Sequence, residues 1–193
     1  MNNKTIGLIS LCSSPFLAID FMVHGGFDNH IPTSLGGLFN LIYMTGWFLC
    51  ILTLYQMHAR TKKIVRIVFA TQVVFLCLAE ISNLWSIVQP VSNNNLFTIL
   101  DLFWPVSNGF MFFTGLTILL SKKITGWQRY IPLFVGLWLP ATIASSIIMG
   151  NTPATVVFIS IYSAVAWSLL ALSVYTNNQA NATQEVRLST QTA

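Results

Sequence analysis

The strongest constraint on the fold is the succession of long apolar runs along the chain. A helix rises ~1.5 Å per residue, so about 20 consecutive apolar residues are needed to cross a bilayer core of ~30 Å. Runs of this length predict transmembrane helices near residues 6–24, 35–56, 64–88, 96–120, 130–149 and 154–175. We therefore expect an all-α integral membrane bundle of six transmembrane helices, formed as one domain by residues 1–176.

The composition supports a bilayer rather than water as the main solvent. Only 7% of the 193 residues are charged and 54% are hydrophobic, whereas a soluble domain carries about 25% charged residues. The basic residues stand in small groups between apolar runs and form no extended patch, which argues against nucleic-acid binding. The expected partner is the lipid bilayer, and the short loops and low charge are typical of a bacterial inner-membrane protein.

The distribution of positive charge predicts the orientation. The nine Lys and Arg residues fall in four places: Lys4; Arg60, Lys62, Lys63 and Arg66; Lys122, Lys123 and Arg129; and Arg187. With six helices, all four places lie on one side of the membrane, and positive residues are retained on the cytoplasmic side during insertion. Both termini are therefore expected in the cytoplasm, and the polar segment 177–193 is predicted to be a disordered cytoplasmic tail.

No cofactor or metal is expected from the sequence motifs. Three cysteines lie inside apolar runs, without metal spacing or a disulfide framework, and are interpreted as packing residues: Cys12, Cys50 and Cys77. The helix cores hold no lysine for a retinal Schiff base and no facing histidines for haem. Asp20, His24, Asp28 and His30 could supply some ligands of a metal site, which is the alternative, but their spacing matches no known ligand signature.

One carboxylate lies deep in a predicted helix. Glu80, in the stretch FLCLAEISNLW, is placed ~12 Å below the outer end of the helix near 64–88, close to the bilayer centre. An acid at that depth costs roughly 2.5–3.5 kcal/mol on insertion scales. No Lys or Arg lies in a predicted helix core, so protons, a cation, a cationic ligand or His24 would have to neutralise it.

Other polar side chains share helix faces in the middle or the outer half of the bilayer. Helical spacing pairs Glu80 with Asn83 and places the remaining candidates on neighbouring helices: Asp20 and His24, Asn40, Asp101 and Asn108. Turning helix faces of this polarity toward lipid costs free energy. We expect them to meet inside the bundle, in an acidic polar pocket open to the extracytoplasmic side.

Such a pocket predicts a binding or transport-like role for protons, a cation, or a small cationic or amphipathic ligand. In this hypothesis Glu80 is the central charge and Asp101 the entrance charge, with Asn83 and Asn108 as neutral hydrogen-bond donors around them. An intramembrane lipid-modifying enzyme is the first alternative, with Glu80 and Asp101 as general acid and base. Enzymatic activity is not the favoured interpretation.

The second alternative is a structural or assembly subunit, in which the polar residues only join helices. Interhelical hydrogen bonds of this kind contribute roughly 0.6 kcal/mol each. Asp20 would then be a solvated interface residue, Asp101 a helix cap, and Glu80 a protonated acid bonded to an Asn. Finally, Pro105, Pro132 and Pro140 predict helix kinks, and the SSPF stretch ending at Phe16 predicts a helix distortion.

Overall fold

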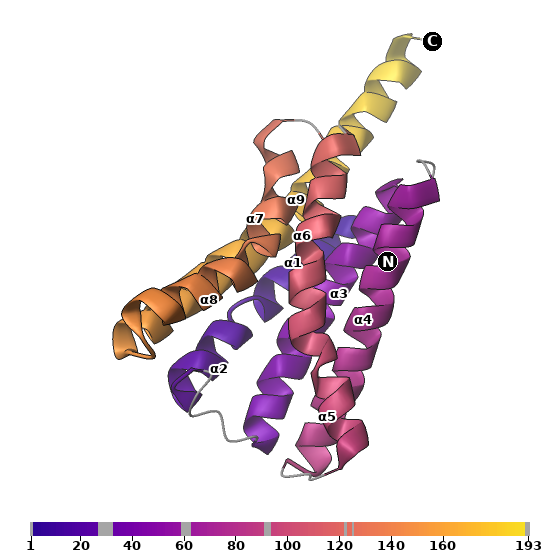
Figure 1. Ribbon diagram of the computed structural model, residues 1–193. Helices are drawn as coiled ribbons and strands as arrows, with labels where there is room; N and C mark the ends of the chain where they lie inside the picture. The colour runs from indigo at the N-terminus through magenta and orange to yellow at the C-terminus, as the bar shows by residue number, and fades with distance from the viewer. Residues whose placement is uncertain are drawn as a thin grey trace.

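The computed structural model describes residues 2–26, 33–58, 63–90, 94–121, 123, 124 and 126–191, with side chains through Thr176. In these residues the chain is helical with no strand (Figure 1). The helices are α1 Asn3–Ser13, α2 Phe16–His24, α3 Ser34–His58, α4 Lys63–Val88, α5 Asn95–Asp101, α6 Phe103–Ser121, the 3-10 helix η1 Gly126–Tyr130, α7 Ile131–Gly136, α8 Trp138–Met149 and α9 Pro153–Gln191. The predicted all-α class is confirmed.

The helices form five spans long and apolar enough to cross a membrane. These are Asn3–His24, Ser34–His58, Lys63–Val88, Asn95–Ser121 and Pro153–Thr176. A sixth span is obtained if Gly126–Gly136 and Trp138–Met149, which meet at an angle of 49°, are counted as one. Over the described residues the fold thus has five or six candidate spans, which is compatible with a multi-pass membrane protein.

The first break, between α1 and α2, lies at a proline. A proline has no N–H, so Pro15 cannot bond to the carbonyl of Leu11 one turn earlier. The side chain of Ser14 takes over this role, because its Oγ donates a hydrogen bond of 2.8 Å to the Leu11 carbonyl. The distortion predicted from SSPF is therefore present, and a neighbouring serine satisfies the freed backbone group.

The other two breaks each precede a proline by three residues. The turn at Leu102 between α5 and α6 precedes Pro105, and the bend at Leu137 between α7 and α8 precedes Pro140. In both cases the proline cannot continue the helical hydrogen bonds of the preceding turn. Pro132 differs from expectation: it occupies the first turn of α7, where a proline lacks no helical partner, so it starts a helix rather than kinking one.

Small residues let several helices approach closely. A Cβ added to Gly115 of α6 would lie 2.5 Å from the Leu133 Cα of α7, and one added to Gly136 would lie 2.5 Å from the Phe112 Cα. At the other side of the bundle, a Cβ on Gly7 of α1 would lie 2.7 Å from the Tyr175 Cβ of α9. Close backbone contact of this kind is the usual basis of helix association in membranes.

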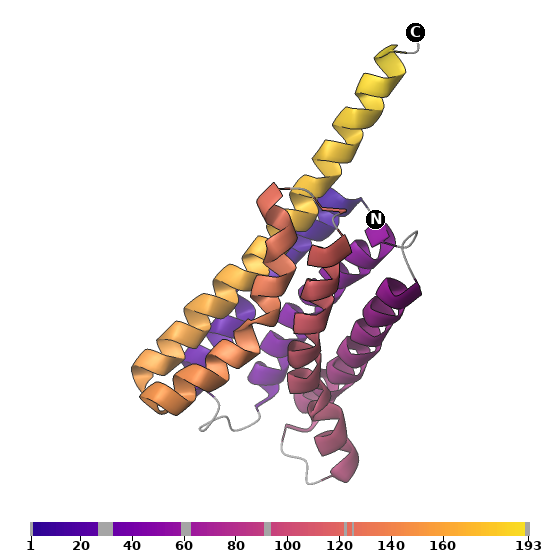
Figure 2. The same cartoon turned by 45° about the horizontal axis from the view of Figure 1, so that its top comes forward.

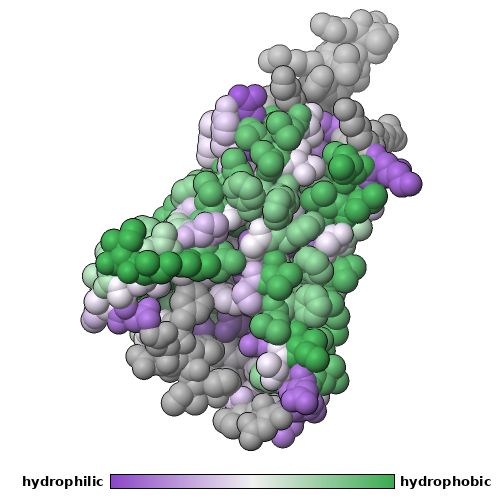
Figure 3. Space-filling view, in the orientation of Figure 1, coloured by the Kyte–Doolittle hydropathy of each residue, from purple (hydrophilic) through white to green (hydrophobic). Residues whose placement is uncertain are grey.

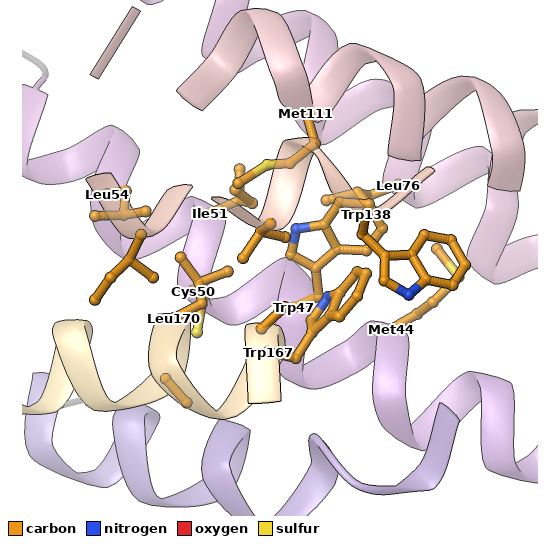
Figure 4. Packing of buried hydrophobic residues seen from close by; sticks show 14 of the residues in the cluster. Met44, Trp47, Cys50, Ile51, Leu54, Leu76, Met111, Trp138, Trp167 and Leu170 are labelled. Atoms are coloured by element: carbon orange, nitrogen blue, oxygen red, sulfur yellow. The ribbon is translucent and has the colours of Figure 1, made fainter. Parts of the chain in front are cut away.

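The core is aromatic at its centre (Figure 4). The rings of Trp47, Trp138 and Trp167 come from α3, α8 and α9 and are at most 3% exposed. The Trp167 ring centroid lies 5.6 Å from that of Trp47 and 5.4 Å from that of Trp138, edge to face in both cases. This arrangement suits the ring quadrupoles and ties three helices together.

The outer surface is strongly apolar. In Figure 3 hydrophobic residues cover most of the middle of the visible face, and the most hydrophilic residues lie near its two ends. Large side chains stand fully outward, including Val88 at 86%, Ile148 at 80% and Ile147 at 78% exposure. An exposed apolar belt of this extent is compatible with a membrane-contacting surface.

The last helix continues past the bundle. Figures 1 and 2 both show α8 alongside the first half of α9, while the C-terminal part of α9 extends beyond the other helices. The backbone of α9 is helical through Gln191. The disorder expected for residues 177–193 stays a prediction.

Candidate functional site

A polar cavity of about 290 Å³ lies at the end of the bundle where α2 and α4 end and α3 and α5 begin. Its walls come from five helices and one loop residue: Leu17, Asp20, Phe21, Thr33, Gly37, Asn40, Asn83, Ser86, Phe97, Asp101 and Trp104. Four residues expected from the sequence to form a polar pocket are therefore brought to one cavity: Asp20, Asn40, Asn83 and Asp101.

Asp20 is the most buried acid of the cavity. Its carboxylate is 2% exposed and is held from two sides. The Oδ1 atom lies 2.9 Å from Nδ1 of His24, and Oδ2 accepts a hydrogen bond of 3.1 Å from Nδ2 of Asn40. The alternative in which Asp20 is a solvated interface residue is thus wrong, because its carboxylate is buried between α2 and α3.

His24 and Thr33 extend this network across the connection between α2 and α3. Nε2 of His24 lies 3.1 Å from the Thr33 hydroxyl, which also accepts a 2.9 Å hydrogen bond from the Gly36 backbone N–H. Thr33 therefore caps the start of α3, while Gly25, in the left-handed region at φ 75°, ends α2. A neutral His24 with its proton on Nδ1 donates to Asp20 and accepts from Thr33.

Gly36 provides the room for this network. A Cβ at Gly36 would lie 3.2 Å from Oδ1 of Asp20 and 3.2 Å from Oγ1 of Thr33. The backbone of α3 consequently comes close to the Asp20–His24 pair. The Gly36 carbonyl also accepts a 3.0 Å hydrogen bond from Asn40, which orients the Asn40 amide toward Asp20.

The opposite wall carries a second acid and aromatic rings. Asp101 is the last residue of α5, its side chain is exposed, and it lines the cavity near its rim. Phe97 and Trp104 lie one turn to either side of it, and Phe21 faces them from α2. The wall thus combines a carboxylate with large aromatic side chains.

Glu80 lies outside this cavity, contrary to the expectation that it forms the central charge. Its side chain is half-buried between α3 and α4, where Oε1 accepts a 3.0 Å hydrogen bond from the exposed Thr45 hydroxyl. Its other oxygen lies 3.4 Å from Nδ2 of Asn83. Three residues on a helix correspond to a rotation of about 60° short of a full turn, so Asn83 lines the cavity while Glu80 lies beside Thr45 of α3.

Asn108 also lies away from the cavity lining. It is 2% exposed, and its Nδ2 donates a 2.9 Å hydrogen bond to the Trp104 carbonyl of the same helix. Asn83, by contrast, lines the cavity and places Nδ2 3.1 Å from the Met44 sulfur. The sequence therefore brings Asn83, but not Asn108, to the cavity wall.

The electrostatic environment of the cavity is acidic. Its lining includes two carboxylates and no Lys or Arg. The basic residues that the structure describes lie at the opposite helix ends or just beyond them: Lys4, Lys63, Arg66, Lys123 and Arg129. His24 is the cationic partner available to Asp20 within the described residues, when its ring is protonated.

The floor of the cavity is the aromatic core. The Trp138 ring lies 6.0 Å from the ring of Phe21 and 5.9 Å from that of Trp104, so both lining rings rest on it. Behind Trp138 lies Trp167, and the interior is packed toward the opposite helix ends. Within the described residues, the packed core therefore closes the cavity on the side of the opposite helix ends.

Sequence reasoning missed five polar or aromatic members of the cavity: Phe21, Thr33, Ser86, Phe97 and Trp104. Thr33 stands just before an apolar run, and a threonine in that position is a sequence signal for the N-cap of a helix. Ser86 follows Asn83 at i, i+3, which places it on the same helix face. Nothing in the local sequence distinguishes Trp104 from the other tryptophans.

Within the described residues, no group of three His, Cys, Asp or Glu side chains lies close enough to hold a metal ion. Asp28 and His30, two of the four residues considered as metal ligands, lie outside the described residues. Comparison of the chain with models of known protein families, with curated proteins and with solved structures gives no match.

Proposed function

We propose that this chain is a multi-pass membrane protein that binds a small organic cation in its polar cavity. In this proposal six spans cross the membrane, both termini lie in the cytoplasm, and the cavity opens to the extracytoplasmic side of a bacterial inner membrane. The observation that carries the proposal is a carboxylate-lined cavity with aromatic walls and no Lys or Arg in its lining.

The charge distribution supports a cationic ligand. Asp101 stands at the rim and Asp20 lies inside, so an entering cation meets two acidic groups in a partly desolvated space. Charge interactions strengthen as the effective dielectric falls. An anion would gain nothing from these walls, because the described basic side chains are at the other helix ends.

The lining supports an organic rather than an inorganic cation. Phe21, Phe97 and Trp104 present aromatic surface, which attracts ammonium groups through the ring quadrupole. A bare divalent cation would instead need six or more oxygen ligands in close geometry. The volume of about 290 Å³ lies at the lower end of the ~300–1,000 Å³ typical of small-molecule sites.

The binding test uses the purified protein in lipid nanodiscs and tetramethylammonium as the probe. Asp101→Asn keeps the shape of the exposed rim residue and removes its charge, so the dissociation constant should rise on the order of tenfold. Glu80→Gln is the matched control, because Glu80 is a half-buried acid that lies outside the cavity lining. Equal effects of the two variants, or no binding to the unmodified protein, would refute the proposal.

The membrane orientation has a separate test. Reporter fusions at Ala193 and in the Gly25–Gly37 connection should report opposite sides of the membrane, with Ala193 in the cytoplasm. The physical reason is the placement of all nine Lys and Arg residues on one side of a six-span chain. An extracytoplasmic Ala193 would place the cavity on the cytoplasmic side and overturn the proposed access.

A further inference from the structure

A second cavity of about 570 Å³ adjoins the first one, between α5–α6 and α8. Its lining is mainly apolar and includes Leu102, Leu139, Ile143 and Ile147. Ile143 and Ile147 are 51% and 78% exposed, so this groove lies on the outer surface of the bundle, which is the surface that faces lipid in a membrane. We call it the lateral groove.

The lateral groove and the polar cavity share a wall. Asp101 and Trp104 line both of them. A ligand held at these two residues is therefore in contact with an acidic, aromatic cavity on one side and an apolar groove on the other. The shape of the joined space is that of a polar site with an apolar extension toward the bilayer.

From these two observations we propose that the bound cation is amphipathic: its ammonium group occupies the polar cavity at Asp101 and Trp104, and its alkyl chain lies in the lateral groove. The ligand enters sideways from the bilayer along α8. This inference rests on the proposed cation site and specifies the class of its ligand.

The test measures how the affinity of the protein for the cation depends on the length of its alkyl chain. Tetramethylammonium and octyltrimethylammonium are titrated into nanodiscs, and the octyl compound should bind at least ~tenfold more tightly, because each buried methylene contributes about 0.8 kcal/mol. Since longer chains also partition into lipid, a variant must separate the two effects. Ile143→Trp fills the groove and should abolish this gain while leaving tetramethylammonium binding unchanged.

Ile148→Trp is the matched control for that variant. Ile148 is the same residue type on the same helix, is 80% exposed, and does not line the groove. It should keep the full chain-length gain. If Ile143→Trp and Ile148→Trp retain the same gain, the chain lies in the bilayer rather than in the lateral groove, and the inference is wrong.

The outcomes separate this inference from the proposed function. If tetramethylammonium binds and depends on Asp101 but chain length and groove variants have no effect, the cation site stands and the amphipathic ligand is refuted. If neither cation binds, both are refuted. If octyltrimethylammonium binds without any dependence on Asp101, the groove accepts bilayer-like acyl chains only, and the joint site does not exist.

Discussion

The contact between α6 and α7 offers a sharp test of the fold, because two glycines of α6 differ in what surrounds them. A Cβ added at Gly115 would lie 2.5 Å from the Leu133 Cα and 2.6 Å from the Pro132 carbonyl carbon, both of which belong to the backbone of α7. A Cβ added at Gly109 would meet only the Leu139 Cδ2 atom, at an ordinary 3.6 Å.

The expected magnitude follows from these distances. Non-bonded carbons prefer separations of about 3.5–4.0 Å, so Gly115→Ala requires the helices to separate by ~1 Å. Overpacking of this degree costs about 1–3 kcal/mol. Replacing glycine by alanine in a helix also contributes up to ~1 kcal/mol of stabilisation, but this gain is common to both variants. Gly115→Ala should therefore unfold with a free energy about 1–3 kcal/mol lower than Gly109→Ala.

The assay is unfolding in mixed micelles by titration with a denaturing detergent, followed by circular dichroism. Gly109→Ala should match or exceed the unmodified protein, whereas Gly115→Ala should unfold at a lower detergent fraction. Gly136→Ala, whose Cβ would lie 2.5 Å from the Phe112 Cα, tests the same contact from α7 and should behave like Gly115→Ala. If both variants are as stable as Gly109→Ala, α6 and α7 do not cross at this point.

Three further predictions concern the polar network, the tail and the deep acid. Gln72→Ala should lower the unfolding free energy by about 1–3 kcal/mol in the same assay, because its buried amide donates to the Ser107 carbonyl and accepts from Thr114; a smaller loss than that of the exposed control Cys77→Ala would contradict it. Truncation after Thr176 should leave thermal stability nearly unchanged, and a collapse of the folded protein would show that the tail docks. Glu80→Gln should fold normally and keep ligand binding, since an amide oxygen still accepts the hydrogen bond from Thr45. Loss of ligand binding would show that Glu80 belongs to the binding site.

The fold class and helix positions could be predicted because they depend on local composition. Each predicted span overlaps a helix or a broken pair of helices in the structure, since about 20 apolar residues have few alternatives to a membrane-length helix. The breaks within the helices are harder to predict from the sequence. Pro105 and Pro140 interrupt their helices three residues upstream, but Pro132 starts one, and only the position of a proline relative to the helix start separates these cases.

The site could be predicted in part because depth is easier to infer than direction. Counting residues from the helix ends correctly grouped Asp20, Asn40, Asn83 and Asp101 at one end of the bundle, where they line one cavity. The direction of a side chain depends on how the helix is rotated against its neighbours. Glu80 has the same depth argument in its favour as Asn83, yet the rotation of α4 places it beside Thr45 of α3 and outside the cavity lining.

The same prolines that interrupt the helices also account for where the cavities form. The break at Pro15 separates α1 from α2, the segment that carries Asp20, and the turn before Pro105 lies between Asp101 and Trp104, the two residues shared by both cavities. The bend before Pro140 directs α8 away from α7 by 49°, and α8 forms the far wall of the lateral groove. Straight helices of this apolar composition would pack along their whole length and leave little space between them. The missing backbone N–H of a proline thus has a structural consequence well beyond its own turn. It lets the helices separate at one end of the bundle, while the glycine contacts and the tryptophan core keep them together elsewhere.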